Sequence, residues 1–143
     1  MDAEKFLRAQ EYSYQTALSE IRNGQKQSHW IWYIFPQLAG LGRSGMSREY
    51  GLNDLQDAKE YLANPVLREH LLEIAGVLLT LDDDIRNIMG SHIDAVKLRS
   101  SMALFREAEP ELIIFQQVLD KFYQGIPDKI TLSILNHTQK NLP

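Results

Sequence analysis

The chain is divided into runs of apolar residues at helical spacing, and each run ends at residues that cap or break a helix. Residues 3–22 keep this spacing up to Asn23-Gly24, a pair typical of helix ends. Asn64-Pro65 combines a capping residue with proline at the first helical position, and the spacing resumes directly afterwards. The pattern predicts an all-α fold.

The length and the number of runs define the expected architecture. A chain of 143 residues can bury the core of one domain without disulfides, so we expect a compact single domain over residues 1–143. It would be a bundle of about six to eight helices with one long glycine-rich loop. The expected helices are 3–22, about 27–35, one capped by Asn53, 65–81, 85–89, one capped by Ser91, 110–123 and 127–135.

Composition excludes several classes of function. The net charge of -4 disfavours non-specific binding to nucleic acid, and the absence of cysteine excludes disulfides and thiol nucleophiles. No apolar stretch reaches the ~20 residues that span a bilayer, and the polar start is not that of a signal peptide. The four histidines lack metal-ligand spacing. We therefore expect a cytoplasmic protein without a metal site, and no cofactor is indicated.

Residues 26–37 form the most aromatic segment of the chain and contain both tryptophans. On a helix, Lys26, His29 and Tyr33 would share one face, where His29 could donate a hydrogen bond or transfer a proton. The alternative is structural, with Trp30 and its aromatic neighbours filling the core. Residue types alone favour the structural role.

The next segment, residues 37–51, contains four glycines and no apolar period, so we expect the longest loop here. Its backbone N–H groups could cradle a ligand together with Gln37, Arg43 and Ser44. A structural loop, whose glycines only permit tight turns, fits the sequence equally well.

A third group of polar residues lies within a predicted helix. Lys97, Ser100 and Ser101 are three and four residues apart, and two adjacent serines run against helix propensity. This cost suggests either an anion site shared with Arg99 or hydrogen bonds to a neighbouring loop. A Ser-Lys nucleophile pair is a weaker third interpretation, because no oxyanion hole is identifiable.

Elsewhere, polar residues favour structural roles. The run Ser91-His92-Ile93-Asp94 has the spacing of a capping box, with Asp in place of the preferred Glu. His70 lies on a charged helix face, where solvent exposure is the simplest expectation.

Several of these motifs together resemble one family. Residues 29–37 (His-Trp-Ile-Trp-Tyr-Ile-Phe-Pro-Gln), residues 40–44 (Gly-Leu-Gly-Arg-Ser), Asp94 with Lys97, and the serine pair before Leu104-Phe105 are similar to the domain of unknown function 1810 family. The resemblance spans nearly the full chain. It implies an all-α fold and no established activity.

Two positions depart from the family pattern. Ala103 stands where Thr is usual and Ile93 where Pro is common, so a shared site that used the threonine hydroxyl would be altered here. Members are sometimes labelled calpastatin-like. That label conflicts with the composition, because calpastatin is a disordered, repeat-built inhibitor whereas this chain is apolar enough to be globular.

The leading hypothesis is a site, either for binding alone or enzymatic, that takes a small polar or anionic molecule between the aromatic segment and the double-serine helix. The alternative is a protein-interaction module. The candidate ligand-binding residues are Lys26, His29, Trp30, Tyr33, Gln37, Arg43, Ser44, Lys97, Ser100 and Ser101. The hypothesis requires these two distant segments to meet in space.

Overall fold

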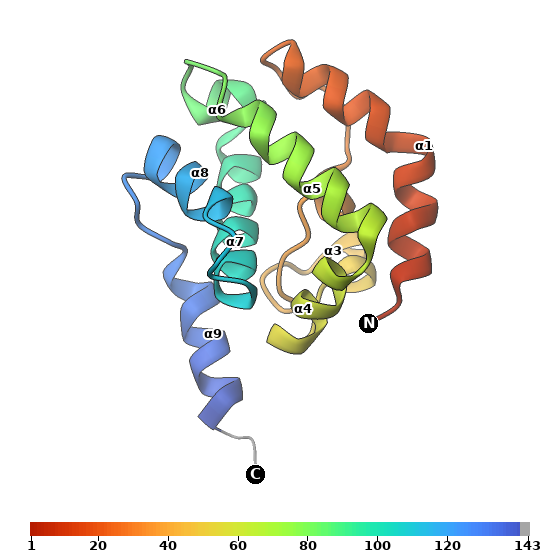
Figure 1. Ribbon diagram of the computed structural model, residues 1–143, viewed down its shortest axis with the longest axis vertical. Coiled ribbons are helices and arrows are strands. Elements are labelled where there is room, and N and C mark those ends of the chain that lie inside the picture. Colours follow the sequence, from red (N-terminus) through yellow and green to blue (C-terminus); the bar gives the residue numbers. More distant parts are fainter. Residues whose placement is uncertain (141–143) are drawn as a thin grey trace.

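The computed structural model describes residues 1–140, with side chains as far as Asn136, and this part of the chain is built from helices (Figure 1). The side chain of His137, one of the four scattered histidines, lies outside the described residues. The helices are, in chain order, α1 (Ala3–Arg22), α2 (Ile31–Ile34), α3 (Gly45–Tyr50), α4 (Leu55–Ala63), α5 (Pro65–Leu78), α6 (Ile85–Ile88), α7 (His92–Ala108), α8 (Ile114–Tyr123) and α9 (Lys129–Lys140). Extended backbone pairs within residues 1–140 only at an isolated parallel bridge between Leu38 and Leu52. The predicted all-α class is confirmed.

Helix α7 is the central element, because it packs against α2, α4, α6, α8 and α9. Its residues from Ser100 to Phe105 are all buried, as expected for a helix enclosed on all sides. Figure 1 shows α8 and α9 on one side of α7 and the segments that follow α1 on the other. Helix α7 therefore contacts helices from both the first and the second half of the sequence.

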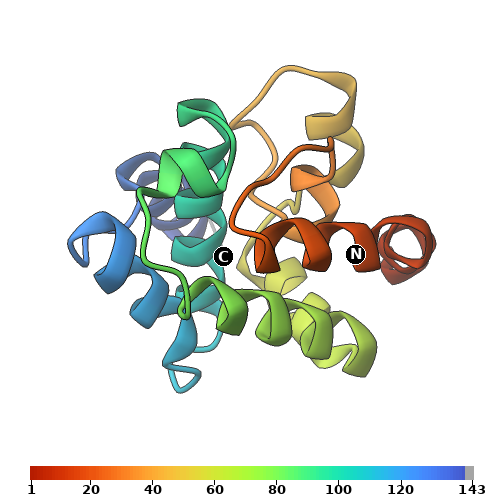
Figure 2. The same cartoon turned by 90° about the horizontal axis from the view of Figure 1, so that it is seen from above.

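Helices α1 and α5 pack side by side. Figure 2 shows both helices from above, with the chain after α1 running between α1 and α7. This connecting stretch is residues 23–30, which include the first residues of the aromatic segment. Its path brings the aromatic segment against α7.

A row of aromatic rings in edge-on and tilted contact connects α1, α4, α7 and α8. The ring of Tyr61 on α4 meets Phe6 of α1 edge-on, with centroids 5.3 Å apart, and lies 5.3 Å from Phe105 of α7. Phe105 in turn lies 5.8 Å from Phe115 of α8. All four side chains are buried. Such contacts add roughly 0.5–1.5 kcal/mol each beyond area burial.

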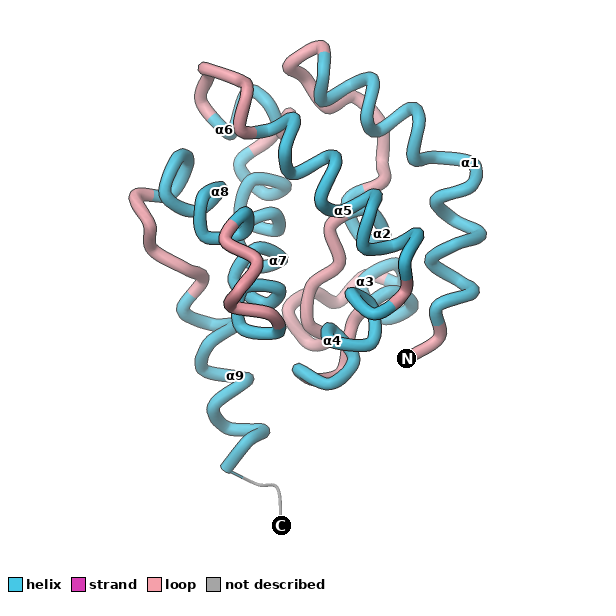
Figure 3. Tube along the Cα trace, viewed as in Figure 1, coloured by secondary structure: helices cyan, strands magenta, loops and turns pink. Residues whose placement is uncertain are grey.

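The glycine-rich loop and the helix expected from about Gln27 differ most from the structure, and Figure 3 marks helix and loop along the chain. The helix expected over 65–81 ends at Leu78, the one expected over 110–123 begins at Ile114, and the one expected over 127–135 spans Lys129–Lys140. The glycine-rich loop contains α3, which forms because the Ser44 side chain accepts a hydrogen bond from the Ser47 N–H at 3.1 Å. The helix expected from about Gln27 is shorter and begins at Ile31. It ends at Ile34, because Pro36 disfavours helical geometry at Phe35.

Helix caps follow the sequence signals closely. Asn64 caps α5 as predicted, with its side chain accepting from the N–H groups of Val66 and Leu67. Helix α4 is capped by Asp54, one residue after the predicted Asn53. Among the described residues, no helix combines the length and the apolar character needed to cross a membrane.

Candidate functional site

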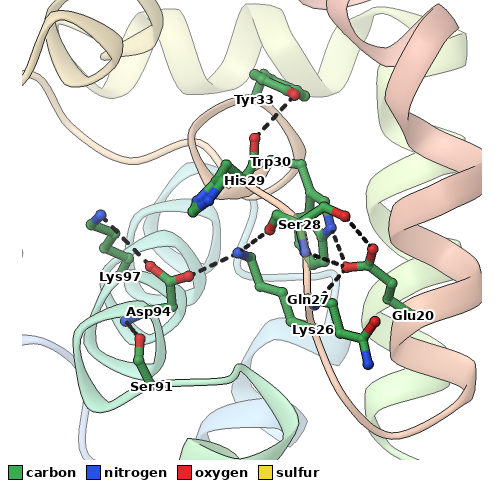
Figure 4. A network of polar contacts seen from close by, with 10 residues as sticks. All are labelled: Glu20, Lys26, Gln27, Ser28, His29, Trp30, Tyr33, Ser91, Asp94 and Lys97. Carbon is green, nitrogen blue, oxygen red and sulfur yellow. Dashed lines mark hydrogen bonds and ion pairs between the residues drawn. The ribbon is translucent and has the colours of Figure 1, made fainter.

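The aromatic segment and α7 are joined by an ion-pair cluster of Lys26, Asp94 and Lys97, which we call the lysine–aspartate cluster (Figure 4). Lys26 Nζ lies 2.9 Å from Asp94 Oδ2, and Lys97 Nζ lies 3.6 Å from Asp94 Oδ1. The Lys26 side chain is only 5% exposed. Two ammonium groups share one carboxylate, so the cluster keeps one positive charge.

Lys26 is held from several sides. Its ammonium donates to the Ser28 carbonyl and lies 4.9 Å from the Trp30 ring centre, while its backbone N–H donates to the Ile88 carbonyl at 2.7 Å. Gly90 has φ +82°, and a Cβ there would lie 2.8 Å from the Lys26 carbonyl oxygen. The segment is thus docked onto the turn between α6 and α7, and glycine is needed for this close approach.

Asp94 departs from the role that the capping box predicts. Ser91 caps α7 as expected, since its side chain accepts from the Asp94 N–H at 3.1 Å. The carboxylate of Asp94, however, pairs with the two lysines instead of closing the box. Local spacing identified the cap, but the ion pair depends on chain segments that are distant in sequence.

Glu20 at the end of α1 supports the same segment from the other side. Its carboxylate accepts hydrogen bonds from Gln27 N at 2.7 Å, Ser28 N at 2.9 Å, the Ser28 hydroxyl and Trp30 Nε1 at 2.9 Å. Burial raises the pKa of Glu20, but these hydrogen bonds outweigh it and lower the pKa to about 2. Sequence reasoning missed this residue, because nothing in the local pattern marks it.

A pocket of about 270 Å³ opens between residues 37–42, α7 and the start of α9. We call it the α7–α9 pocket. Its polar lining includes three predicted site residues, Gln37, Lys97 and Ser100. Its apolar walls are formed by Leu41, Ile93, Val96 and Ile130. The pocket therefore offers a polar end and an apolar body.

The polar lining of the pocket is held in place by neighbouring groups. Lys97 Nζ lies 4.7 Å from the ring centre of Trp32, and the Ser100 hydroxyl donates to the Val96 carbonyl at 3.2 Å. Asp128 also lines the pocket, but its carboxylate accepts from the backbone N–H and hydroxyl of Thr131. The ammonium of Lys97 is the charged donor that faces the pocket.

The structure places other candidate residues away from this pocket. The Tyr33 hydroxyl donates to the His29 carbonyl at 3.3 Å, and its ring lies 5.2 Å from Tyr50. Ser44 caps α3, and Arg43 is exposed and does not line the pocket. Ser101 is completely buried and its hydroxyl has no partner among the described residues.

Residues Trp30 and His29 differ in burial although they are adjacent. Trp30 is 1% exposed and belongs to the core, whereas His29 is exposed and lies before the start of α2. In Figure 4 the His29 imidazole points to the side of the segment on which Asp94 and Lys97 lie. The helical face that the sequence predicted for Lys26, His29 and Tyr33 does not form, because α2 covers only one of them.

His70 is not solvent-exposed as expected but half-buried in a polar network. Its Nδ1 lies 2.8 Å from Gln10 Oε1, and its ring stacks on Tyr14 with centroids 3.7 Å apart. Gln10 Nε2 also donates to the Tyr33 carbonyl and to the Tyr61 hydroxyl. Burial lowers the pKa of His70. This network joins α1, α2, α4 and α5.

Within the described residues, no group of three or more His, Asp or Glu side chains is arranged to hold a metal ion. The candidate site consists instead of ammonium, hydroxyl and amide groups beside apolar walls. These groups suit the binding of a small organic molecule.

The fold and the site define an all-α protein with a pocket of mixed polar and apolar lining beside its central helix. The chain belongs to the family described as protein of unknown function (DUF1810), whose model matches residues 1–135. It is similar to the crystal structure of the conserved hypothetical protein Rv1873 from Mycobacterium tuberculosis, at 37% identity with a TM-score of 0.91. That likeness covers 94% of this chain and 96% of the mycobacterial one. No curated protein is significantly similar.

Proposed function

We propose that this protein binds a small molecule with an apolar body and one anionic end in the α7–α9 pocket. One observation carries the proposal. Gln37 and Lys97, from the two segments whose polar residues were unexplained by sequence, share this pocket with Ser100. Leu41, Ile93, Val96 and Ile130 give the pocket apolar walls, as in most small-molecule sites, and His92 and Asp128 complete its polar lining.

The charge of the site supports an anionic end. Lys97 shares Asp94 with Lys26, so the carboxylate neutralises only one of the two ammonium groups. An anion bound beside Lys97 would meet this positive charge, while the carboxylate of Asp128, which also lines the pocket, is held by Thr131 at the start of α9. A hydrogen bond to a charged group contributes about 1.5–3 kcal/mol, which corresponds to at least a tenfold change in affinity.

The size of the pocket limits the ligand. Drug-sized ligands occupy roughly 300–1,000 Å³, and the α7–α9 pocket is slightly smaller at about 270 Å³. Short aliphatic or aromatic carboxylates match this volume and chemistry. Hexanoate and the neutral alcohol hexanol form a matched pair of probes, because they share the same apolar chain.

We expect hexanoate, but not hexanol, to shift the backbone amide signals of residues 37–42 and 92–100 in a saturable NMR titration. Lys97→Met should lower the hexanoate affinity at least tenfold, because it removes the charged donor. Lys59→Met on α4 is the matched control, since it removes the same charge and does not line the pocket. Unmoved amides, or an equal loss in both variants, would contradict the proposal.

The rim of the pocket favours a second candidate function, the docking of a protein. Ile93 is 66% exposed and Ile130 is 63% exposed, and both line the pocket. Exposed apolar residues that lie together often mark interaction surfaces. A protein partner would need the apolar rim more than the ammonium, so Ile93→Ser would weaken its binding more than Lys97→Met.

A further inference from the structure

A second hollow lies on the other side of α7, between α6, α7 and the end of α8. Its volume is about 410 Å³, and it is lined by Arg86, Arg99, Lys121 and Tyr123 among others. We call it the Arg99 hollow. His92 and Val96 line both this hollow and the α7–α9 pocket, so a single layer of side chains separates the two.

Arg99 is fixed in position while the end of its side chain stays free. Its Nε donates to the Ile126 carbonyl at 2.8 Å, and its guanidinium carbon lies 5.6 Å from the Tyr123 ring centre. Tyr123 is itself anchored, because its hydroxyl donates to the Ala95 carbonyl at 2.6 Å. The two terminal nitrogens of Arg99 make no hydrogen bond to any described residue.

The other cations of the hollow already have partners. Arg86 binds Asp84 through both Nε and Nη2, at 3.0 and 2.9 Å. Lys121 donates to the Leu79 carbonyl at 2.8 Å and pairs with Asp82 at 3.3 Å. Among the described residues, Arg99 is therefore the arginine or lysine of this lining that is not paired with a carboxylate.

The charge balance of the lining permits an anion. The hollow is lined by three cationic side chains and by two carboxylates, Asp83 and Asp84. Asp84 is held by Arg86, and Asp83 accepts from the Asp84 N–H and from Asn87 Nδ2. Both carboxylates are thus engaged at the α6 side, away from the Arg99–Tyr123 pair.

We infer that the Arg99 hollow is a second binding site, which takes a carboxylate or phosphate group on the free edge of the Arg99 guanidinium. A planar guanidinium presents paired N–H donors that match the oxygens of such groups. The contact with the Tyr123 ring and the hydrogen bond to the Ile126 carbonyl hold the guanidinium in position before a ligand binds. Less side-chain entropy is then lost on binding. An anion site shared by Arg99 and Lys97 was one of two interpretations of the sequence pattern, whereas the structure puts the two residues in the linings of separate hollows.

The test uses inorganic phosphate and acetate as probes, titrated into the full chain at constant ionic strength set with sodium chloride. NMR follows the Arg99 Nε–H signal and the amides of residues 95–99 and 121–123. We expect saturable shifts of these signals with phosphate or acetate and none with chloride alone. A shift with only one of the two anions still supports the site and identifies the preferred group.

Two variants of Arg99 distinguish the contribution of its paired N–H donors from the contribution of its positive charge. Arg99→Gln should abolish the shifts of residues 121–123, and Arg99→Lys should weaken binding at least fivefold, because it keeps the charge without the paired donors. Arg48→Gln on α3, which removes the same charge from an exposed position, should leave the affinity within twofold. An equal loss in Arg48→Gln would overturn the inference.

The wild-type titration needs no variant to fold, and absence of shifts at residues 95–99 and 121–123 overturns the inference by itself. The outcome is independent of the proposed function, which is read from residues 37–42 with hexanoate. Shifts confined to residues 37–42 would support only the α7–α9 pocket. Shifts confined to residues 121–123 would support only the Arg99 hollow.

Discussion

At the scale of single residues, the two adjacent serines of α7 have opposite environments. The Ser100 hydroxyl donates to a carbonyl and lines the α7–α9 pocket, whereas the Ser101 hydroxyl is buried without a partner among the described residues. A buried, unsatisfied polar group costs about 1–3 kcal/mol. The helical pattern showed that both serines were unusual, but it could not show which one was satisfied.

We expect Ser101→Ala to raise the free energy of unfolding by about 1 kcal/mol, because alanine removes the unpaired hydroxyl at nearly constant volume. Urea denaturation measures the change. Ser100→Ala is the matched control and should lower stability slightly, since it removes a hydrogen bond. A loss of stability in Ser101→Ala would mean that a bound molecule satisfies the hydroxyl.

The limit of sequence reasoning at this scale is visible in Asp94. The sequence indicated a capping box and a lysine one turn later on the same helix. It could not indicate that Lys26 lies beside the same carboxylate, because that pairing depends on how the α6–α7 turn is docked. Lys97, Gln37 and Ser100 were predicted from chemistry, and they share one pocket for reasons of tertiary packing.

At the scale of elements, helix ends were the most predictable feature. Asn64-Pro65 and Ser91 cap their helices as the sequence indicates, because a cap is a contact between close neighbours. The short helices α2 and α3 were less predictable, although α6 lies within the expected range 85–89. Helix α3 lies in a stretch whose glycines argue for a loop, and it depends on the Ser44 cap and on packing against α2.

At the start of α4, the cap predicted from the sequence, Asn53, can be compared directly with the cap in the structure, Asp54. Asp54→Ala should lower the free energy of unfolding by about 1 kcal/mol, because the Asp54 side chain accepts from the Asp57 N–H at 2.9 Å. Asn53→Ala should leave stability nearly unchanged, since its side chain makes no capping hydrogen bond. Thermal unfolding of both variants tests the assignment, and the reverse order of stabilities would contradict it.

At the scale of the whole molecule, the row of aromatic rings from α1 to α8 determines how the layers meet. Each ring was recognisable from sequence as a core residue. Their neighbours in space were not, because Phe6, Tyr61 and Phe105 come from helices that are far apart along the chain. Which helices pack together is set by the fit of side chains, and periodicity does not encode it.

Glu20 predicts how the stability of the whole molecule responds to acid. Its pKa is lowered to about 2 in the folded state, from an ordinary value of 4.5. The ionised carboxylate therefore stabilises the fold fully above pH 4.5, and this contribution is lost as the pH falls towards 2. The hydrogen bonds to the aromatic segment are the source of the effect.

We expect Glu20→Gln to lower the free energy of unfolding at pH 7 by about 1–2 kcal/mol, at the low end for a charged hydrogen bond because the carboxylate is partly exposed. The difference from wild type should shrink below pH 4.5 and be lost as the pH falls through about 2. Glu11→Gln, on an exposed position of the same helix, should follow the wild-type pH profile. A difference that stays constant with pH would contradict this explanation.

The close approach of Gly90 to the Lys26 carbonyl has a consequence for homologous sequences. Any larger side chain at that position collides with the main chain of the aromatic segment and forces it onto another course. A homologue with a larger residue there would have to bring its aromatic segment to the central helix by another path, and its buried lysine would change position with that path.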